Sequence, residues 1–272
     1  MSKFFEFYFN PQAKKDTILE TFCFSPNSQE EEKLGKLYLL GELKNVLPKN
    51  RELLKKISEI IKNEYYAFPQ REAGESLKES LKKANQFLEK EFKEENTTWL
   101  GNLNFFVIGQ TSDLSVYFSK VGNLKTFLFR GKEIFNLENE EGIKNSAVKI
   151  FSNIVEGKLI KEDRILVLGE ELFENLWQNQ IFNDLKLIKK PREFKKLFKK
   201  NKERLREFFG VLIFIFIKKE RRKIYFHPVK LLGTRFTGKL PSYLFQEKFK
   251  RSLKYILILI LLLLLGYLIF NR

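Results

Sequence analysis

Cysteine and histidine are almost missing from this sequence, which contains one of each in 272 residues. The single cysteine, Cys23, cannot form an internal disulfide or belong to a cysteine-rich metal cluster, which indicates a reducing compartment. Because it lies in the apolar stretch TFCF, we predict that Cys23 belongs to the core. The single histidine, His227, argues against a histidine-based metal site and a Ser-His-Asp triad, which excludes several classes of enzyme.

Several sequence motifs are missing as well. The start of the chain, MSKFFEFYFN, has no charged segment followed by an apolar run and a small-residue cleavage site, so we expect no signal peptide. Zinc-finger spacings, a glycine-rich phosphate loop and an aromatic ribonucleoprotein motif are also absent. Nucleic acid is therefore not an expected partner.

Acidic residues are scarce only in the last third of the chain. Residues 1–182 contain 26 Lys and Arg against 28 Asp and Glu, whereas residues 183–272 contain 24 against 6. The formal net charge of +16 therefore comes entirely from the C-terminal third. This distribution is typical of a protein whose C-terminal end faces an anionic surface, such as anionic lipid.

That third contains a run of 16 residues without a charge, YILILILLLLLGYLIF. As a helix it would be about 24 Å long at 1.5 Å per residue, somewhat shorter than the roughly 30 Å hydrocarbon core of a bilayer. Basic side chains can extend from its ends to the headgroups, and tyrosines favour the interface. We therefore predict a transmembrane helix, the alternative being a buried core helix. The expected anchoring residues are Arg251, Lys254, Tyr255, Tyr267 and Arg272.

The charges on either side of this run predict its orientation. The basic segment KLPSYLFQEKFKRSLK precedes the run, and Arg272 alone follows it. Since positive flanks stay on the cytoplasmic side, we expect a single-pass membrane protein whose N-terminal domain is cytoplasmic. The expected divisions are a folded domain over residues 1–228, a basic juxtamembrane linker over 229–252, and the transmembrane helix with a short tail over 253–272.

Upstream of this segment, apolar residues recur at the spacing of strands and helices in alternating blocks. Residues 102–136 are typical of a meander of antiparallel hairpins, with turns at QTSD, VGN and RGK. Antiparallel strands with segregated helices indicate an α+β fold. The other expected strands are FFEFYF, residues 35–43 and residues 210–218, and the expected helices are residues 49–63, residues 74–93 and a helix that begins near Pro191.

Two strands are predicted to end in the same pair of residues, Gly-Glu. In RILVLGEELFEN, a buried strand and a tight turn lead into a helix, and Glu170 and Glu171 suit the positive N-terminus of that helix. Helix capping does not account for Glu42 in LLGEL, because the residues that follow it do not predict a helix. Since active sites often open at strand ends, we predict that Glu42 and Glu170 lie close together.

Short motifs stand at the junctions between these blocks. They are Asp16 before TILETFCF, Glu42 after LYLLG, Ala84-Asn85 ahead of Thr97-Thr98, Asn123 in VGN, Gly157-Lys158-Leu159 leading to Asp163, and Glu170 in LGEEL. Their order resembles that of the metal-dependent Ser/Thr protein phosphatases of the PPM type over residues 15 to 218. The resemblance implies a four-layer α+β sandwich, in which helices flank two antiparallel sheets. It also implies a site where Asp residues hold two metal ions, which bind phosphate and generate the attacking hydroxide.

The departures from the family pattern fall at the metal positions. Glu42 and Glu170 stand where the family has Asp, so each carboxylate reaches one methylene further, and magnesium tolerates little error in its octahedral geometry. Leu43 and Glu171 replace glycines. Efficient catalysis is therefore not expected.

Two further family residues have no clear counterpart. Where the family has an Asp-Asn pair before the last strand, this chain has Phe-Phe-Gly, and Glu207 is the nearest acid. Lys14 and Lys15 are the available substitutes for the phosphate-binding arginine. The acids that could form a degenerate metal site are Asp16, Glu42, Glu170 and Glu207, and weak binding of Mg²⁺ or Mn²⁺ stays open.

Three interpretations follow. The first is a membrane-anchored PPM-type phosphatase-like protein that is catalytically impaired, a pseudophosphatase, and acts as a binding or regulatory module toward a phosphoprotein or kinase. The second is an active, divergent Mg²⁺- or Mn²⁺-dependent phosphoprotein phosphatase that uses the four acids. The third is a basic membrane-surface adaptor with an unrelated α+β fold.

Overall fold

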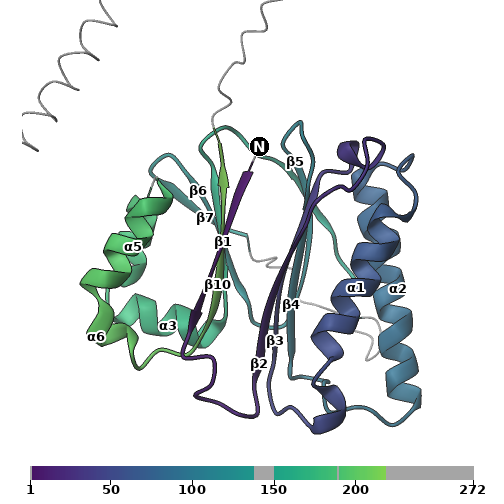
Figure 1. Ribbon diagram of the computed structural model, residues 1–272, viewed down its shortest axis with the longest axis horizontal. Coiled ribbons are helices and arrows are strands. Elements are labelled where there is room, and N and C mark those ends of the chain that lie inside the picture. The colour runs from purple at the N-terminus through teal and green to yellow at the C-terminus, as the bar shows by residue number, and fades with distance from the viewer. Residues whose placement is uncertain (1, 138–149, 189, 219–272) are drawn as a thin grey trace, which may run out of the picture. The chain divides into compact units, whose positions relative to one another are not determined.

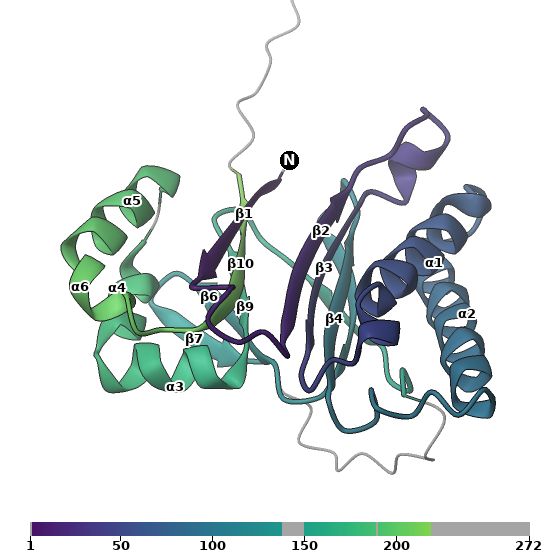
Figure 2. The same ribbon diagram turned by 60° about the horizontal axis from the view of Figure 1, so that its bottom comes forward.

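The computed structural model describes residues 2–137, 150–188 and 190–218. These residues belong to a compact unit, Met1–Arg221. Two antiparallel β-sheets face each other within this unit, and helices cover the outer side of each sheet (Figure 1). Figure 2 shows the same layers after a rotation, with α1 and α2 outside one sheet and α3 to α6 outside the other.

One sheet has the strand order β1-β10-β9-β6-β7, with all four pairings antiparallel. Strand β10 of this sheet, sequence GVLIFIFI, is buried along its whole length. Strands lie on both sides of it, and its two faces pack in the core beneath the helices and in the core between the sheets. A continuous apolar run, rather than an alternating one, is typical of such a doubly covered strand. The strands are β1 (Ser2–Phe9), β6 (Lys125–Arg130), β7 (Glu133–Asn136), β9 (Arg164–Leu168) and β10 (Gly210–Ile217).

The other sheet has the order β2-β3-β4-β5-β8, again antiparallel throughout. Its interior strands β3 and β4 are almost completely buried. The strands are β2 (Ile18–Phe24), β3 (Lys36–Leu43), β4 (Leu103–Gln110), β5 (Ser115–Val121) and β8 (Val155–Lys158).

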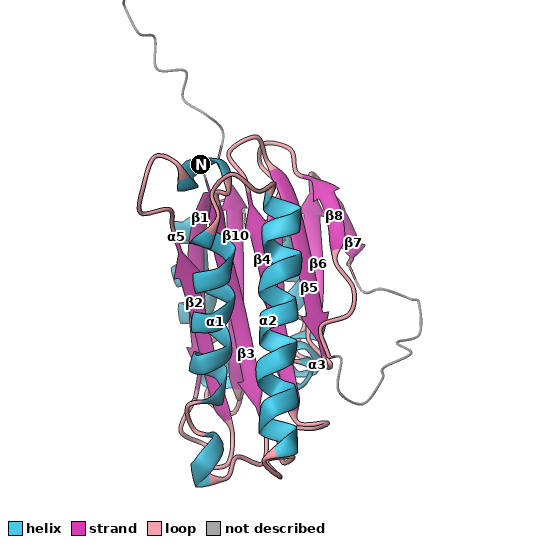
Figure 3. Cartoon of the chain, turned by 90° about the vertical axis from the view of Figure 1, so that its right-hand side faces the viewer, coloured by secondary structure: helices cyan, strands magenta, loops and turns pink. Residues whose placement is uncertain are grey.

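The helices pack through their apolar faces. Figure 3 shows α1 and α2 side by side across the sheet that contains β3 and β4. Leucines at helical spacing on α2, such as Leu77, Leu81 and Leu88, join the core beneath it. The α-helices are α1 (Leu53–Ala67), α2 (Ala73–Lys93), α3 (Glu170–Gln178), α4 (Ile181–Leu187), α5 (Pro191–Lys200) and α6 (Lys202–Leu205), and the 3-10 helices are η1 (Glu31–Lys33) and η2 (Pro48–Asn50).

The α+β class and the two antiparallel sheets flanked by helices agree with the sequence-based prediction. Two of the three hairpin turns of the predicted meander are confirmed. Strands β4 and β5 form a hairpin, as do β6 and β7, but the chain passes from one sheet to the other between β5 and β6. The core assignment of Cys23 is wrong, because Cys23 is exposed on β2, an edge strand that has a neighbour on one side only.

Several predictions fall outside the described residues. These are the linker over 229–252, the transmembrane helix over 253–272, and the residues His227, Arg251, Lys254, Tyr255, Tyr267 and Arg272. None of the helices within residues 2–137, 150–188 and 190–218 is both long enough and apolar enough to cross a bilayer.

Candidate site at the ends of β3 and β9

The ends of β3 and β9 meet between the two sheets. Side chains alternate along a strand, so Glu42 shares the face of Leu40, which lies in the core between the sheets. On β9, Val167 lies in the same core, and Gly169 follows two residues later. The fold therefore directs Glu42 toward the turn that precedes Glu170.

The Glu42 side chain is buried, with 5% of the residue exposed. In the strand register Glu42 lies between Leu19 of β2 and Asn104 of β4. A β-carbon built on Gly169 would lie 2.5 Å from Glu42 Oε2, so the missing side chain at Gly169 makes room for the carboxylate. The Glu42 carboxylate thus lies against the residue that precedes Glu170, at the N-terminus of α3.

Lysines accompany both of these acids. Lys44 Nζ lies 3.3 Å from Glu42 Oε1, because residues 42 and 44 point to the same side of the chain. Lys125 Nζ lies 3.6 Å from Glu170 Oε1. The strand register explains this second pair, since Lys125 at the start of β6 is paired with Leu168 at the end of β9.

A third lysine contacts the next acid of α3. Lys14, in the loop between β1 and β2, donates hydrogen bonds to both carboxylate oxygens of Glu171, at 2.8 and 2.6 Å. Its ammonium also lies 4.8 Å from the ring centre of Phe209. Lys14, which we predicted as a substitute for the phosphate-binding arginine, thus contacts a carboxylate and an aromatic ring.

The other two predicted metal ligands, Asp16 and Glu207, are both exposed. Asp16 is exposed, and its backbone carbonyl accepts a hydrogen bond from Val46 N, which ties its loop to the segment after β3. Glu207 is exposed in the segment between α6 and β10. Asn10 holds that segment by donating to the Phe208 carbonyl at 2.8 Å. Both acids are exposed on loops, and neither is buried with Glu42.

The turn that contains Asn123 also lies beside the site. The backbone N–H of Asn123 donates a hydrogen bond to Asn104 Oδ1 at 2.8 Å, and Asn104 on β4 is paired with Glu42 on β3. Gly122 has a φ of +73°, and a β-carbon there would collide with the same Asn104 oxygen. An amide side chain on β4 therefore fixes this turn.

Two other family-like motifs have structural contacts. Asp163 is buried at the start of β9, the opposite end from Glu170, and Arg130 donates to its carboxylate, with the closest distance 2.7 Å. These hydrogen bonds raise the pKa of the Arg130 guanidinium. Thr98 Oγ1 accepts a hydrogen bond from Asn50 Nδ2 at 2.5 Å. Asp163 and Thr98 therefore stabilise the fold away from Glu42.

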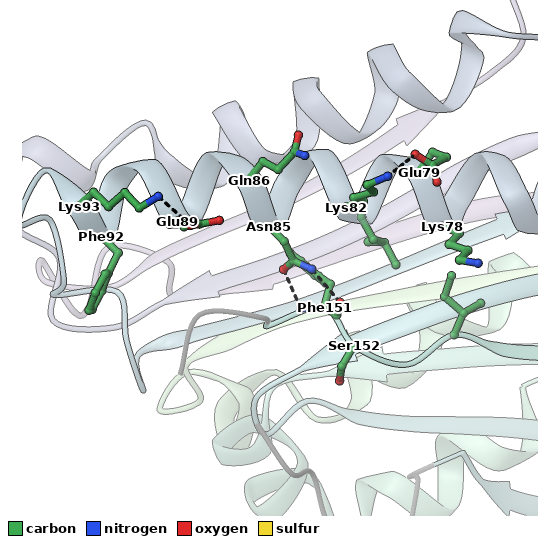
Figure 4. A pocket seen from close by; sticks show the side chains of 12 residues that line it. Lys78, Glu79, Lys82, Asn85, Gln86, Glu89, Phe92, Lys93, Phe151 and Ser152 are labelled. Carbon is green, nitrogen blue, oxygen red and sulfur yellow. Dashed lines mark hydrogen bonds and ion pairs between the residues drawn. The ribbon is translucent and has the colours of Figure 1, made fainter. Parts of the chain in front are cut away.

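Asn85, the remaining motif residue, lines a groove along α2 (Figure 4). Its amide group pairs with the backbone of Phe151, donating to the carbonyl at 2.8 Å and accepting from the N–H at 3.0 Å. The groove is lined by α2 and residues 151–154, whereas Glu42 points between the sheets. It is therefore separate from the acids.

The acids do not assemble into a metal-binding cluster. Among the described residues, no three Asp, Glu, His or Cys side chains come together as ligands of one ion. Glu42, Glu170 and Glu171 each have a lysine ammonium in ion-pair contact instead. The residues present thus do not fit the two-metal centre that the sequence resemblance implies. Lys44 was visible in the sequence as the second residue after Glu42, whereas Lys125 was not, because its contact depends on the strand register.

Solved structures of protein phosphatases share this fold. The catalytic domain of the serine/threonine protein phosphatase PstP, in complex with two manganese ions, superposes with a TM-score of 0.55 at 9% identity, over 80% of this chain and 98% of that chain. The PP2C phosphatase domain of SpoIIE from Bacillus subtilis, with a fragment of its regulatory domain, gives 0.54 at 15% identity, over 81% and 63%. PppA, a regulatory component of the type VI secretion system in Pseudomonas aeruginosa, gives 0.53 at 8% identity, over 79% and 96%.

No protein-family model and no curated protein matches the sequence. At identities of 8–15% the structural likeness concerns the fold. The two facing antiparallel sheets with helices outside are thus the architecture of the PP2C/PPM-type Ser/Thr phosphatase domains.

Proposed function

We propose that this chain is a membrane-anchored PPM-type phosphatase-like protein with little or no phosphatase activity, which acts by binding a phosphoprotein or a kinase. The observation that carries the loss of activity is the set of three lysine–glutamate pairs at the ends of β3 and β9. The fold of the solved phosphatases supports the relationship, and it removes the support for an adaptor of unrelated fold.

The pairing opposes metal binding for an electrostatic reason. An ammonium group that already neutralises a carboxylate must be displaced, or must stay close to a second positive charge, when a divalent cation binds there. Glu42 is buried, so repulsion around its carboxylate is weakly screened by solvent. A metal ion at this site would therefore compete with the lysine ammonium groups for the carboxylates.

The lost glycines act in the same direction. Leu43 stands where the resemblance predicts a glycine beside the metal, and its side chain is 1% exposed in the core beneath α1 and α2. The strand cannot move toward an ion without disturbing that core. Misplacing reacting groups by about 1 Å can cost on the order of a hundredfold in rate, so a site altered at several positions is expected to be inefficient.

The membrane anchor is supported by the sequence. The charge-free run near the C-terminus and the basic segment before it predict one membrane span with the folded unit on the cytoplasmic side. A phosphatase-like domain held at a membrane could bring a phosphorylated partner to that surface without hydrolysing its phosphate.

Turnover measurements test the loss of activity. The purified full chain, in detergent, is assayed with an aryl phosphate and a phosphopeptide in Mn²⁺ or Mg²⁺, beside an active PPM phosphatase. We expect no more turnover than from the Glu42→Ala/Glu170→Ala variant. Robust metal-dependent turnover that Glu42→Ala and Glu170→Ala each abolish would instead establish the active, divergent phosphatase.

A further inference from the structure

We propose that the outer surface of the α3–α6 helix layer binds anionic lipid headgroups, so that the domain lies against the membrane that anchors it. The main contact is the basic face, which we define as six exposed residues of α5 and α6: Arg192, Lys196, Lys199, Lys200, Lys202 and Arg204. The proposal rests on the membrane anchor of the proposed function and is independent of whether the domain hydrolyses phosphate.

Packing fixes which side of α5 faces outward. Phe194 is fully buried, and its ring centre lies 4.9 Å from that of Phe7 on β1. Phe198 contacts the same Phe7 ring at 4.8 Å. With these rings against the sheet, Lys196 and Lys199 lie on the opposite side of the helix, where both are exposed. The basic face is therefore a rigid surface of the domain.

The charge of this face is poorly compensated. Helices α5 and α6 together contain seven Lys and Arg against two Glu. Of the two acids, Glu203 forms an ion pair with Arg206, outside the basic face. The other acid, Glu193, accepts a hydrogen bond from the Lys190 N–H at 3.1 Å, and Asp184 of α4 contacts Lys200 of the basic face at 4.0 Å. The positive potential over this face is thus largely open to a ligand.

The helix layer on the other sheet differs. Three of the five lysines of α2 have glutamate partners on the same helix or just beyond it: Lys82 with Glu79 at 3.5 Å, Lys90 with Glu94 at 3.7 Å and Lys93 with Glu89 at 2.8 Å. Pairs at this spacing are typical of a solvated helix surface. The contrast between the two layers indicates that the α5–α6 charges have a partner outside the domain.

Exposed apolar side chains on the same layer favour a lipid partner. Leu187 at the end of α4 is 69% exposed and Trp177 on α3 is 58% exposed, the highest values among the large apolar residues described. The Trp177 ring packs against the rings of Phe173 and Phe182. Tryptophan and leucine on a layer that also carries basic residues suit the boundary between headgroups and acyl chains, whereas the phosphate backbone of a DNA duplex would contact the charges.

The full chain is reconstituted in nanodiscs of phosphatidylcholine, with or without phosphatidylglycerol. Amine-reactive labelling, read by mass spectrometry, reports the exposure of each lysine. We expect labelling at Lys196, Lys199 and Lys202 to fall several-fold in the anionic discs and to recover at high salt. Lys56 and Lys83, exposed on α1 and α2, serve as internal references and should not change.

Charge-reversal variants provide the matched control. Lys196→Glu/Lys199→Glu/Lys202→Glu should abolish lipid contact, whereas Lys56→Glu/Lys78→Glu/Lys83→Glu changes the net charge equally on the other helix layer and should leave it intact. Contact is read from quenching of Trp177 by brominated lipid, in a Trp99→Phe background because Trp99, the other tryptophan, is fully buried.

Three outcomes would overturn the proposal: equal labelling of α5–α6 in both kinds of disc, protection of the α1–α2 layer instead, or tighter binding to a DNA duplex than to anionic vesicles. Failure of the anchor is recognised separately, because the chain would then not be retained in the disc of phosphatidylcholine alone. In that case the same labelling, with the chain added to preformed vesicles, still reports on the basic face. If a charge-reversal variant does not fold, the labelling of the unmodified chain decides.

Discussion

At the scale of single residues, Gly169 and Glu42 depend on each other. The backbone angles of Gly169, φ −64° and ψ 150°, suit any residue, so only the contact with Glu42 Oε2 requires a glycine here. A methyl group at Gly169 would displace this carboxylate, which is the end of a flexible side chain but is buried. This pair therefore allows a test of the site that does not depend on activity.

We expect Gly169→Ala to lower the free energy of unfolding by about 1–3 kcal/mol, the usual cost of forcing an extra carbon into a packed site. In the Glu42→Ala background the same change should cost much less, because the clash is gone. Chemical unfolding followed by circular dichroism measures both effects.

Gly157→Ala serves as the control, since its β-carbon would have only an ordinary contact with Val116 at 3.6 Å. That variant should be nearly neutral. If the Gly169→Ala and Glu42→Ala effects simply add, the Glu42 carboxylate does not lie against Gly169, and the site described at the ends of β3 and β9 is wrong.

The acids of this site could be picked out from the sequence, but their partners could not. Glu42 and Glu170 are recognisable because each follows a glycine at the end of an apolar run. Lys125 is 45 positions before Glu170, and only the pairing of β6 with β9 brings them together. Cys23 was assigned to the core from its apolar neighbours, because local sequence does not reveal that β2 is an edge strand.

At the scale of elements, two tyrosines of α1 form hydrogen bonds with the turn that precedes β3. Tyr65 donates a hydrogen bond to the Leu34 carbonyl at 2.7 Å, and Tyr66 donates to the Gly35 carbonyl at 2.8 Å. Gly35 itself has a φ of +75° and passes close to Gln110 of β4, so the turn before β3 is tightly constrained. Burial raises the pKa of both tyrosine hydroxyls well above their ordinary value.

These shifts predict a loss of stability in alkali. Since both pKa values are raised in the folded state, the stabilisation is complete below the unfolded value of about 10 and is lost as the pH rises above it. We expect the free energy of unfolding to fall between about pH 9 and 11, because the unfolded chain releases these protons first. Urea unfolding at several pH values measures this fall.

The Tyr65→Phe/Tyr66→Phe variant separates the two tyrosines from other alkaline effects. It should be less stable than the unmodified chain at about pH 8, by about 1 kcal/mol for each lost hydrogen bond. Its stability should then decline less between about pH 9 and 11. An equal decline in both proteins would show that other groups, such as lysines, cause the alkaline loss.

The elements with strong periodicity were predictable, and the connection between the sheets was not. Strand β10 and helix α2 are recognisable because burial imposes a continuous apolar run on one and a helical apolar face on the other. The turn between β5 and β6 contains Gly122, which is also usual in a hairpin, so its sequence does not distinguish a hairpin from a crossing between sheets. The contact of this turn with Asn104 and the pairing of β6 with β9 decide the path.

At the scale of the whole molecule, charge and apolar character are divided along the chain. The first 182 residues are nearly neutral, and they supply the described part of the fold except for its last helices and β10. The remaining residues supply the basic face and, beyond the described part, the basic segment and the charge-free run. Such a division is expected of a protein that folds on one side of a membrane and holds to it by its other end.

A truncation after Gln246 tests the anchor. Without the charge-free run, the chain should leave the membrane fraction in a high-salt wash, because headgroup contacts through the basic face are screened by salt. The full chain should stay with the membranes, since burial of an apolar span does not depend on ionic strength. Centrifugation of washed membranes, followed by immunoblotting, measures the two proteins.

The Leu262→Arg variant provides a graded control with the run otherwise intact, because an arginine near the centre of a span costs about 2.5–3.5 kcal/mol on insertion scales. It should shift part of the chain to the soluble fraction. The exposed Cys23, the only cysteine, reports orientation in the same preparations. A membrane-impermeant maleimide should label it after lysis and not in intact cells. A truncated chain that resists the salt wash would show that the anchor lies elsewhere, and labelling of intact cells would place the folded unit outside the cytoplasm.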